Sequence, residues 1–322
     1  MTQTSLQISL SPGDVAYAER TVPALVRAHR ASVSEVFLVV DCCRPQRTKA
    51  FDPDRRLPQP AYAERAARIC DIADRFRAQG LADRVVQLHP GDALFAAIAR
   101  KYLRNLIHDT HEFGGTALMA YFAALELART RYLIHYDADM LLYQAAGYDW
   151  PMEARERMDG EAGAVLASPR VSPPFVPPGS PADRPSLHTG DDPAVPTAGG
   201  WRVKWTSTRC FLIDLQKLAS YLPLVRGRYL LEVLARRALS RTYPPPPEVM
   251  LYKRICGDGG WRFDLGTSQA WLLHPNAKNE QFLRLLPGIL RAVAAGQVPE
   301  GQRGWEDLKL DDWARFLDRA TA

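Results

Sequence analysis

Residues 131–140, RYLIHYDADM, join a short apolar run to two carboxylates, Asp137 and Asp139. Tyr132 to Tyr136 have the composition of a strand that is buried on both faces, as the strands of parallel sheets are. Residues 116–129 have helical composition and lie directly before it. The segment therefore predicts a helix followed by a strand that delivers two carboxylates to the end of a sheet.

The residues before this segment alternate between strand and helix patterns. Strands are predicted at residues 6–10, 34–41 and 85–88, and helices at residues 18–29 and around residues 63–76. This alternation predicts an α/β protein with an open, Rossmann-like, mostly parallel central sheet and helices on both faces. Ligands of such sheets bind beyond the carboxyl ends of the strands, where Asp41 and Asp137 both fall.

Composition narrows the class of protein. The chain has 322 residues and is 47% hydrophobic, which is enough for one large domain or two fused halves. Its five cysteines include no CxxC pair, which argues against a disulfide framework and favours a cytoplasmic protein. The first residues lack the pattern of a signal peptide, and no apolar stretch is long enough to span a bilayer. We expect no transmembrane segment, while peripheral membrane contact stays open.

The charge balance suits a small anionic ligand. The net charge is +5, from 41 Lys and Arg against 36 Asp and Glu. No basic stripe interleaved with aromatic residues follows the pattern of a nucleic-acid-binding surface. A nucleotide diphosphate is a suitable partner for this modest excess, whereas a nucleic acid is not expected.

The second half differs from the first in its proline content. Residues 171–200 hold eight of the 25 prolines, so we expect this segment to be an irregular loop, either a functional lid or a linker. A strand-like stretch at residues 205–214 and helical composition at residues 215–239 follow it. A short helix is predicted around Glu248 to Arg254, and amphipathic helices are predicted in the tail.

The carboxylate pair has the chemistry of a metal site. Positions i and i+2 of an extended segment point to the same side, so Asp137 and Asp139 can converge on one ion. Hard oxygen donors select Mn²⁺ or Mg²⁺, which would act as a Lewis acid on a departing diphosphate. The alternative is that the pair merely caps a solvated turn.

Taken together, FLVVD at residues 37–41, a glycine-initiated helix and RYLIHYDADM resemble the inverting glycosyltransferase family 2, of GT-A fold, over roughly residues 5–275. Glu248, Leu251 and Arg254 also match the spacing of that family's pattern, with Pro247 in place of its first carboxylate. The resemblance implies a nucleotide-diphosphate sugar donor and a small-molecule, glycan or peptide acceptor.

The resemblance also implies a role for each candidate residue. Glu248 would be the general base, Asp41 would contact the nucleotide base, and Asp137 would contact the ribose or the ion. Asp139 and His274 would hold the metal. The remaining candidates are Gly114 and Gly115, whose amides at a helix start could face the diphosphate, and Trp201 and Trp205, which could stack on the acceptor or belong to the core.

Three parts of the chain follow from this scheme. Residues 1–150 are expected to bind the nucleotide sugar, residues 151–275 to bind the acceptor and carry catalysis, and residues 276–322 to form a helical tail. The sequence departs from the family at Tyr121 and Phe122, where an Arg-Asn pair is usual. A catalytically silent binding module therefore stays open, as does a nucleotidyltransferase, although SLSPGDVAY lacks the Gly-rich, Lys-containing loop of that class.

Overall fold

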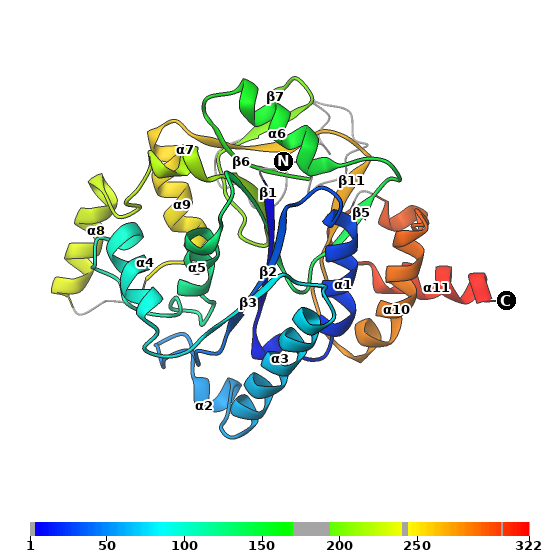
Figure 1. The fold of residues 1–322 in the computed structure, drawn as a ribbon, viewed down its shortest axis with the longest axis horizontal. Coiled ribbons are helices and arrows are strands. Elements are labelled where there is room, and N and C mark those ends of the chain that lie inside the picture. The colour runs from blue at the N-terminus through cyan, green and yellow to red at the C-terminus, as the bar shows by residue number, and fades with distance from the viewer. Residues whose placement is uncertain (1–3, 170–193, 240–243, 304, 322) are drawn as a thin grey trace.

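One mixed sheet forms the centre of the molecule in the computed structural model, which describes residues 4–169, 194–239, 244–303 and 305–321 (Figure 1). The described strands of this sheet follow the order β3-β2-β1-β4-β9-β6-β10-β8-β7. They comprise β1 (Thr4–Leu10), β2 (Glu35–Asp41), β3 (Arg84–Leu88), β4 (Tyr132–Asp137), β6 (Ala164–Ser168), β7 (Val195–Thr197), β8 (Gly200–Val203), β9 (Cys210–Asp214) and β10 (Trp261–Leu265).

The first four strands of this order are all parallel. β1 pairs with β2 on one side and with β4 on the other, and β3 pairs with β2. Because parallel strands end at the same edge, the carboxyl ends of β1, β2 and β4 lie together. Beyond β4 the sheet is mixed, since β9 runs antiparallel to both β4 and β6, while β6 and β10 are parallel. The α/β class and the mostly parallel sheet predicted from the sequence are confirmed.

Helices cover both faces of the sheet. The structure contains α1 (Ala18–His29), α2 (Pro53–Arg56), α3 (Ala61–Ala78), α4 (Ala93–Leu103), α5 (Met119–Leu127), α6 (Trp150–Gly160), α7 (Leu215–Ala219), α8 (Gly227–Ala238), α9 (Pro247–Ile255), α10 (Glu280–Ala294) and α11 (Leu310–Thr321). Figure 1 shows α1, α3 and α10 on one side of the central strands and α4, α5 and α9 on the other. None of the helices within the described residues is both long and apolar enough to cross a membrane.

Alternating side chains of the buried strands divide the core in two. In β2, Val36, Leu38 and Val40 pack with α1 and α3, whereas Phe37 and Val39 pack with α4 and α5. All five side chains are fully buried. A strand buried on both faces is therefore apolar without interruption, which is why its sequence shows no alternation.

A separate two-stranded sheet lies beside α1 and α10. It pairs β5 (Leu141–Gln144) antiparallel with β11 (Ala270–Leu273), with Leu141 opposite Leu273. The segment directly after β4 is thereby tied to a segment more than 120 residues later. His274, the residue after β11, is brought close to the turn that follows β4.

Three sequence expectations for the second half need correction. Val195–Thr197 and the segment from Gly200 onward are strands, so the stretch 171–200 is regular at its end. Pro196 is tolerated because β7 is the last strand in the sheet order, where no further strand needs its amide. The remainder of that stretch, up to residue 193, lies outside the described residues.

The other two corrections concern helix and strand lengths. The strand predicted over residues 205–214 covers only Cys210–Asp214. The helical stretch predicted over residues 215–239 is two helices, α7 and α8, separated by a segment that contains Pro223. Proline removes a backbone donor and clashes with the preceding turn, which disfavours one continuous helix here, although α1 and α10 accommodate Pro23 and Pro287.

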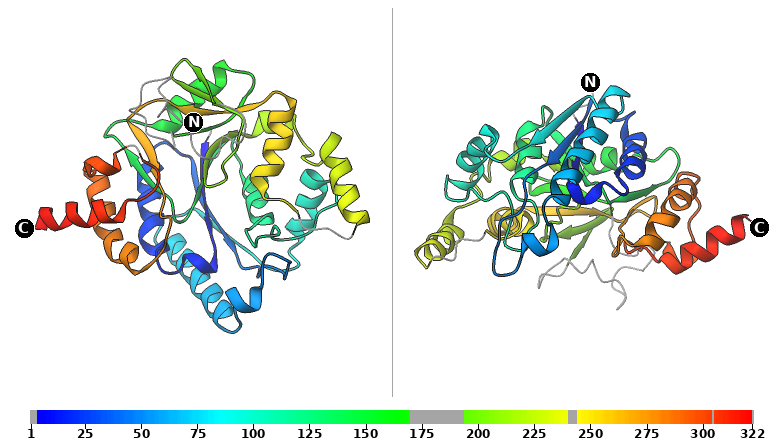
Figure 2. Two further views of the ribbon diagram at one scale, coloured as in Figure 1. Left: turned by 180° about the vertical axis from the view of Figure 1, so that it is seen from behind. Right: turned by 90° about the horizontal axis from the view of Figure 1, so that it is seen from below.

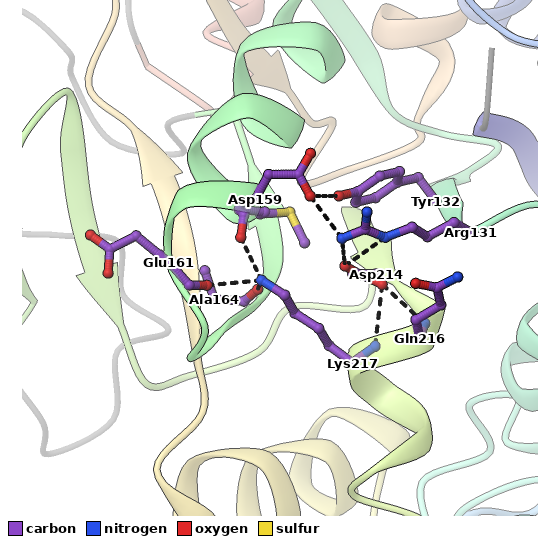
Figure 3. A network of polar contacts seen from close by, with 9 residues as sticks. Arg131, Tyr132, Asp159, Glu161, Ala164, Asp214, Gln216 and Lys217 are labelled. Atoms are coloured by element: carbon purple, nitrogen blue, oxygen red, sulfur yellow. Dashed lines mark hydrogen bonds and ion pairs between the residues drawn. The ribbon is translucent and has the colours of Figure 1, made fainter. Parts of the chain in front are cut away.

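The amino end of β4 is held by a closed network of charged groups (Figure 3). Arg131 donates to Oδ2 of Asp214 from Nε (3.1 Å) and Nη2 (2.7 Å), and also to Oδ1 of Asp159 at 2.7 Å. Oδ1 of Asp214 accepts from the amides of Gln216 and Lys217, which start α7. Both oxygens of the fully buried Asp214 are therefore satisfied by the chain itself.

Candidate functional site

A cavity of about 340 Å³ lies at the carboxyl ends of β1, β2 and β4. Asp41 ends β2 and Asp137 ends β4, and both line the cavity. Asp139 and Gly115 line it as well. Gly114, Trp201, Trp205, Glu248 and His274 are not among its lining residues.

The carboxylate pair spans a strand end and a turn. β4 stops at Asp137, and the amide of Met140 donates to the carbonyl of Asp137 at 3.1 Å. The two carboxylates therefore do not share the extended backbone that the sequence suggested. Each has its own set of partners, although both face the same cavity.

Asp139 is buried, and its two carboxylate oxygens differ in their contacts with the described residues. Its Oδ2 lies 3.5 Å from Nε2 of His274 and contacts the ammonium of Lys278. Burial opposes its ionisation, but hydrogen bonding from His274 and the charge of Lys278 outweigh burial and lower the pKa of Asp139 to about 2. Its Oδ1 has no hydrogen-bond partner among the described residues, although it is buried. An unpaired carboxylate oxygen at a cavity is suited to a ligand cation or donor.

His274 is fixed by the tail of the chain. Its amide donates to the carbonyl of Glu306 at 2.7 Å, and its side chain is largely buried. Nδ1 lies 3.4 Å from Nη1 of Arg209. The two-stranded β5–β11 sheet and the residue 306 segment together hold the imidazole against Asp139.

The donor set fits a divalent cation that keeps most of its ligands outside the protein. Among the residues that the structure describes, no three His, Cys, Asp or Glu side chains gather into a metal cluster. Asp139 and His274 form a pair, and Mg²⁺ and Mn²⁺ are commonly held by one or two carboxylates, substrate phosphates and water. The free Oδ1 of Asp139 supplies one ligand position of this kind.

Asp137 is bound by a tyrosine at the position where the sequence departs from the family pattern. Oη of Tyr121 donates to Oδ1 and Oδ2 of Asp137 at 2.7 and 2.9 Å. Burial, followed by the charge of Asp137, raises the pKa of Tyr121 far above its usual range, so the phenol stays protonated. Phe122, the next residue, is fully buried in the core.

Asp41 is a buried acid that lies next to two neutral groups. Its Oδ1 accepts from the amide of Cys43 at 2.9 Å, and Nε2 of His111 lies 3.5 Å from its Oδ2. Burial raises the pKa of Asp41 to about 7 and lowers that of His111 to about 4. The carboxyl group is thus near its midpoint at neutral pH and can accept or donate a hydrogen bond.

A further acid, Asp14, lines the cavity from the short 3-10 helix Pro12–Asp14 that follows β1. Asp14 accepts from the amide of Ser11 at 2.6 Å and from Oη of Tyr17. Burial raises its pKa to about 6, and the charge of Asp139 adds to that rise. Lys278 also stacks over the Tyr17 ring, 5.5 Å from its centroid.

Glu248 lies in the first turn of α9 and is held by the segment before β9. Oγ1 of Thr208 donates to its Oε2 at 3.2 Å, and Oγ1 of Thr206 donates to its backbone carbonyl at 2.8 Å. Burial raises the pKa of Glu248, and the charge of Asp137 contributes in the same direction. Glu248 is thus electrostatically coupled to the site from an element that does not line the cavity.

The glycine pair does not start a helix. α5 begins only at Met119, and the amides of Gly114 and Gly115 already donate to Glu112, at 2.8 Å to Oε2 and 3.0 Å to the carbonyl. Gly115 has φ +90°, and a Cβ there would meet the Phe51 ring at 2.5 Å. The tight turn keeps the cavity wall in place, and Glu112 uses the donors that the sequence assigned to an anion.

The two tryptophans lie away from the cavity. Trp201 is buried in β8, opposite Asp264 of β10. Trp205 packs on Tyr252 of α9, with ring centroids 5.2 Å apart. Trp205 therefore supports the helix that carries Glu248.

Sequence reasoning missed Lys278, Asp14 and Thr208 as neighbours of the candidate residues. Lys278 follows His274 by four residues, a spacing that gave no motif. Only the rule that loops beyond strand ends line the site could have singled out Asp14.

Comparisons with known proteins gave structural matches only. No family model and no curated protein match the chain. Among solved structures, GalNAc-T7 with UDP, GalNAc and Mn²⁺ is 10% identical, covering 84% of this chain and 43% of that one, with a TM-score of 0.45. The present chain thus spans less than half the length of GalNAc-T7.

Two further structures match over most of the chain. The galactosyltransferase LgtC with donor and acceptor sugar analogs is 12% identical, with coverage of 93% and 99% and a TM-score of 0.39. TarS 1–349 of S. aureus with UDP-GlcNAc is 12% identical, with coverage of 98% and 72% and a TM-score of 0.42. Similarity at this level concerns the fold alone.

Proposed function

We propose that the chain is a glycosyltransferase that moves a sugar from a nucleotide-diphosphate donor to an acceptor hydroxyl, with inversion and with the help of Mn²⁺ or Mg²⁺. The observation that carries this proposal is Oδ1 of Asp139, a buried carboxylate oxygen at the cavity with no hydrogen-bond partner among the described residues. Burying such an atom unpaired costs about 1–3 kcal/mol, so its retention favours a ligand that pairs with it.

Asp139 and His274 are the residues that would hold the cation, and Asp137 would lie near the cation's coordination shell. When bound, the cation would act as a Lewis acid that neutralises charge developing on the departing diphosphate. The chain itself offers Lys278 for the same purpose, since its ammonium already lies on the cavity side of Asp139. With the donor bound, Lys278 can pair with a phosphate oxygen while remaining next to Asp139.

Asp41 is proposed to bind the nucleotide base. It ends β2 at the cavity, and burial holds its pKa at about 7. The edge of a base offers both donors and acceptors, and a carboxyl near its midpoint can complement either. The amide of Cys43 fixes the orientation of one carboxyl oxygen and leaves the other facing His111.

Glu248 is proposed to take the proton of the acceptor hydroxyl as the anomeric carbon is attacked. A general base must be ionised and within reach of that hydroxyl, and a pKa raised toward working pH improves proton transfer. Burial raises the pKa of Glu248, and the hydroxyl of Thr208 fixes one of its oxygens. Attack from the side of α9, opposite the leaving diphosphate, would invert the anomeric centre.

Charge placement around the diphosphate is proposed to supply most of the catalysis. Positive charge develops at the anomeric carbon in glycosyl transfer, and negative charge develops on the leaving group. Preorganised groups that match these charges are usually the largest catalytic contribution. In this chain the anionic Asp137 and the cationic Lys278 both line the cavity.

A catalytically silent binding module is the second candidate. The ammonium of Lys278 contacts Asp139, and Tyr121 engages both oxygens of Asp137, so the chain neutralises part of its own carboxylate pair. Such a module would bind a nucleotide without transferring a sugar. Turnover separates the two candidates.

Donor hydrolysis tests the proposal directly. The full chain is incubated with UDP-, GDP- and dTDP-sugars in the presence of Mn²⁺, and release of the nucleotide diphosphate is measured. We expect one donor class to be hydrolysed and Asp139→Asn to lose the activity by about 10²-fold or more. Lys253→Gln, an exposed change on α9, is the control. Full activity of Asp139→Asn would refute the assignment, and nucleotide binding without hydrolysis would favour the silent module.

A further inference from the structure

Helix α8 carries apolar side chains on a face that points to solvent. Leu231 and Leu234 are 67% and 44% exposed, and Leu239, the residue directly after the helix, is 66% exposed. Ala235 and Ala238 are exposed as well. A single exposed leucine is normal on a protein surface, but several on one short helix mark an interaction surface.

The helical period explains how α8 is apolar on two sides. Tyr229 and Val233 lie four residues apart, are buried and attach the helix to the core. Leu231, Leu234 and Ala238 are spaced by three and four residues, which places them together on another face. The exposed leucines are therefore not needed to hold α8 on the fold.

Arginines border this apolar face. Residues 226–239 contain four arginines and one glutamate, namely Arg226, Arg228, Arg236, Arg237 and Glu232. All four arginines are exposed. Glu232 pairs with Lys253 and with Arg236, so its negative charge is already compensated. The face thus combines exposed leucines with a net positive rim.

A cavity of about 560 Å³ lies between α8 and α9, on the side of α8 that carries Tyr229 and not on the side of the exposed leucines. Its charged lining comprises Arg226 and Arg228, together with Lys253 and Arg254, which pair with Glu232 and Asp258 of the same lining. Tyr229 lines it too, and its Oη is buried without a hydrogen-bond partner among the described residues. Guanidinium and phenol groups are both donors to phosphate oxygens, so the cavity suits an anionic headgroup.

We propose that the outer face of α8 rests on an anionic lipid surface. The leucines would enter the boundary between headgroups and acyl chains, while the exposed arginines that border them would bind lipid phosphates. α8 has 12 residues, too few to span a bilayer, so the helix lies along the surface.

The distribution of charge selects lipid over a second copy of the chain. A two-fold interface places the same patch on both sides, so the arginines that border α8 would face one another. Like charges brought together across an interface are unfavourable. The helix also forms the flank of the molecule opposite α10 and α11, where a planar surface can reach it (Figures 1 and 2).

Vesicle co-sedimentation of the full chain tests this proposal and needs no sugar donor. The probes are vesicles of phosphatidylcholine alone and of phosphatidylcholine mixed with phosphatidylglycerol. Two double variants, Leu231→Gln with Leu234→Gln and Arg228→Glu with Arg237→Glu, alter the apolar face and its rim. Met152→Gln and Arg284→Glu are exposed controls on α6 and α10.

We expect the protein to sediment with the anionic vesicles and not with phosphatidylcholine alone, and added salt should weaken this binding. Each double variant should lower the partition by about tenfold or more, and the controls should bind normally. Failure to sediment, equal binding to both vesicle types, or unchanged binding of the leucine variant would overturn the proposal. A lipid-free dimer that the leucine variant disrupts would assign the face to a second copy instead.

Discussion

Buried carboxylates lie near both ends of strand β4, and they differ in how completely the chain supplies their hydrogen-bond partners. At the amino end, Asp214 of the neighbouring β9 accepts from Arg131 and from two backbone amides, so both its oxygens are satisfied (Figure 3). At the carboxyl end, Asp139 keeps one buried oxygen without a partner among the described residues. Asp41, which lines the same cavity, faces the neutral imidazole of His111.

This difference separates carboxylates that stabilise the fold from carboxylates that await a ligand. A buried charge that the chain pairs completely is a structural feature, and its removal leaves an uncompensated partner. A buried carboxylate that the chain leaves incomplete costs stability, and groups of this kind concentrate at functional sites. Changes at the two ends should therefore affect different measurements.

The largest effect is expected from Glu248→Gln. The amide cannot accept the acceptor's proton, so kcat should fall by about 10³-fold, within the range for a lost general base. The KM for the donor should change little, because Glu248 does not line the donor cavity. Steady-state kinetics with donor and acceptor both varied give the two constants. A fall in donor affinity with unchanged kcat would contradict the role given to Glu248.

Asp214→Asn should have the opposite pattern. It removes the charge that pairs with Arg131 at the other end of β4, and breaking a buried pair costs about 3 kcal/mol. Denaturant unfolding should show this loss, while donor binding by the folded variant stays normal. Thr130→Ser, a neighbouring change that keeps its hydroxyl, is the control. If Asp214→Asn were as stable as wild type but bound the donor poorly, the distinction between the two ends of β4 would be contradicted.

Asp41→Asn should stabilise the protein at high pH. The pKa of Asp41 is raised to about 7 in the folded chain, so folding favours its protonated form. The stability that comes from the protonated carboxyl of Asp41 is therefore complete at pH values below its pKa in the unfolded chain, and it is lost as the pH rises through 7. Asparagine does not ionise, so the variant should gain up to about 4 kcal/mol on wild type at pH 8 and almost nothing at pH 4. Unfolding at both pH values checks this, and a gain that does not depend on pH would contradict it.

Thr208→Val should produce the smallest change, seen in the pH dependence of kcat/KM. Burial raises the pKa of Glu248, so the acidic limb should lie above the usual range of a glutamate. Removing the hydroxyl that donates to Oε2 should move that limb upward by roughly half a pH unit. Thr206→Val, whose hydroxyl bonds only the backbone carbonyl of Glu248, should leave the limb in place. A shift in the control alone would contradict the assignment.

The sequence predicted the parallel half of the sheet because its strands are buried on both faces. Continuous apolar runs locate β2 and β4, and the rule for parallel strand ends then brings Asp41 and Asp137 together. The environment of Asp139 could not be predicted from the sequence in the same way. Its approach to Lys278 depends on the pairing of β5 with β11, a contact between distant segments that local patterns do not encode.

The partner of Asp137 could not be predicted for a different reason. Tyr121 belongs to an almost wholly buried helix, and nothing in its neighbourhood distinguishes a core tyrosine from one that donates to a carboxylate. Likewise, β4 ends at Asp137 and does not reach Asp139, because the amide of Met140 donates to the carbonyl of Asp137 and closes a turn. Local sequence thus locates strands and their terminal acids, whereas hydrogen-bond partners depend on tertiary packing.

Calorimetric titration of nucleotide diphosphates, with and without Mn²⁺, into wild type, Asp139→Asn and Asp214→Asn tests the central claim most directly. We expect wild type and Asp214→Asn to bind one nucleotide with an affinity that rises when Mn²⁺ is added. Asp139→Asn should lose that dependence on Mn²⁺ while keeping its fold. If Asp139→Asn binds nucleotide and Mn²⁺ as wild type does, the free oxygen of Asp139 has no role in ligand binding and the account is wrong.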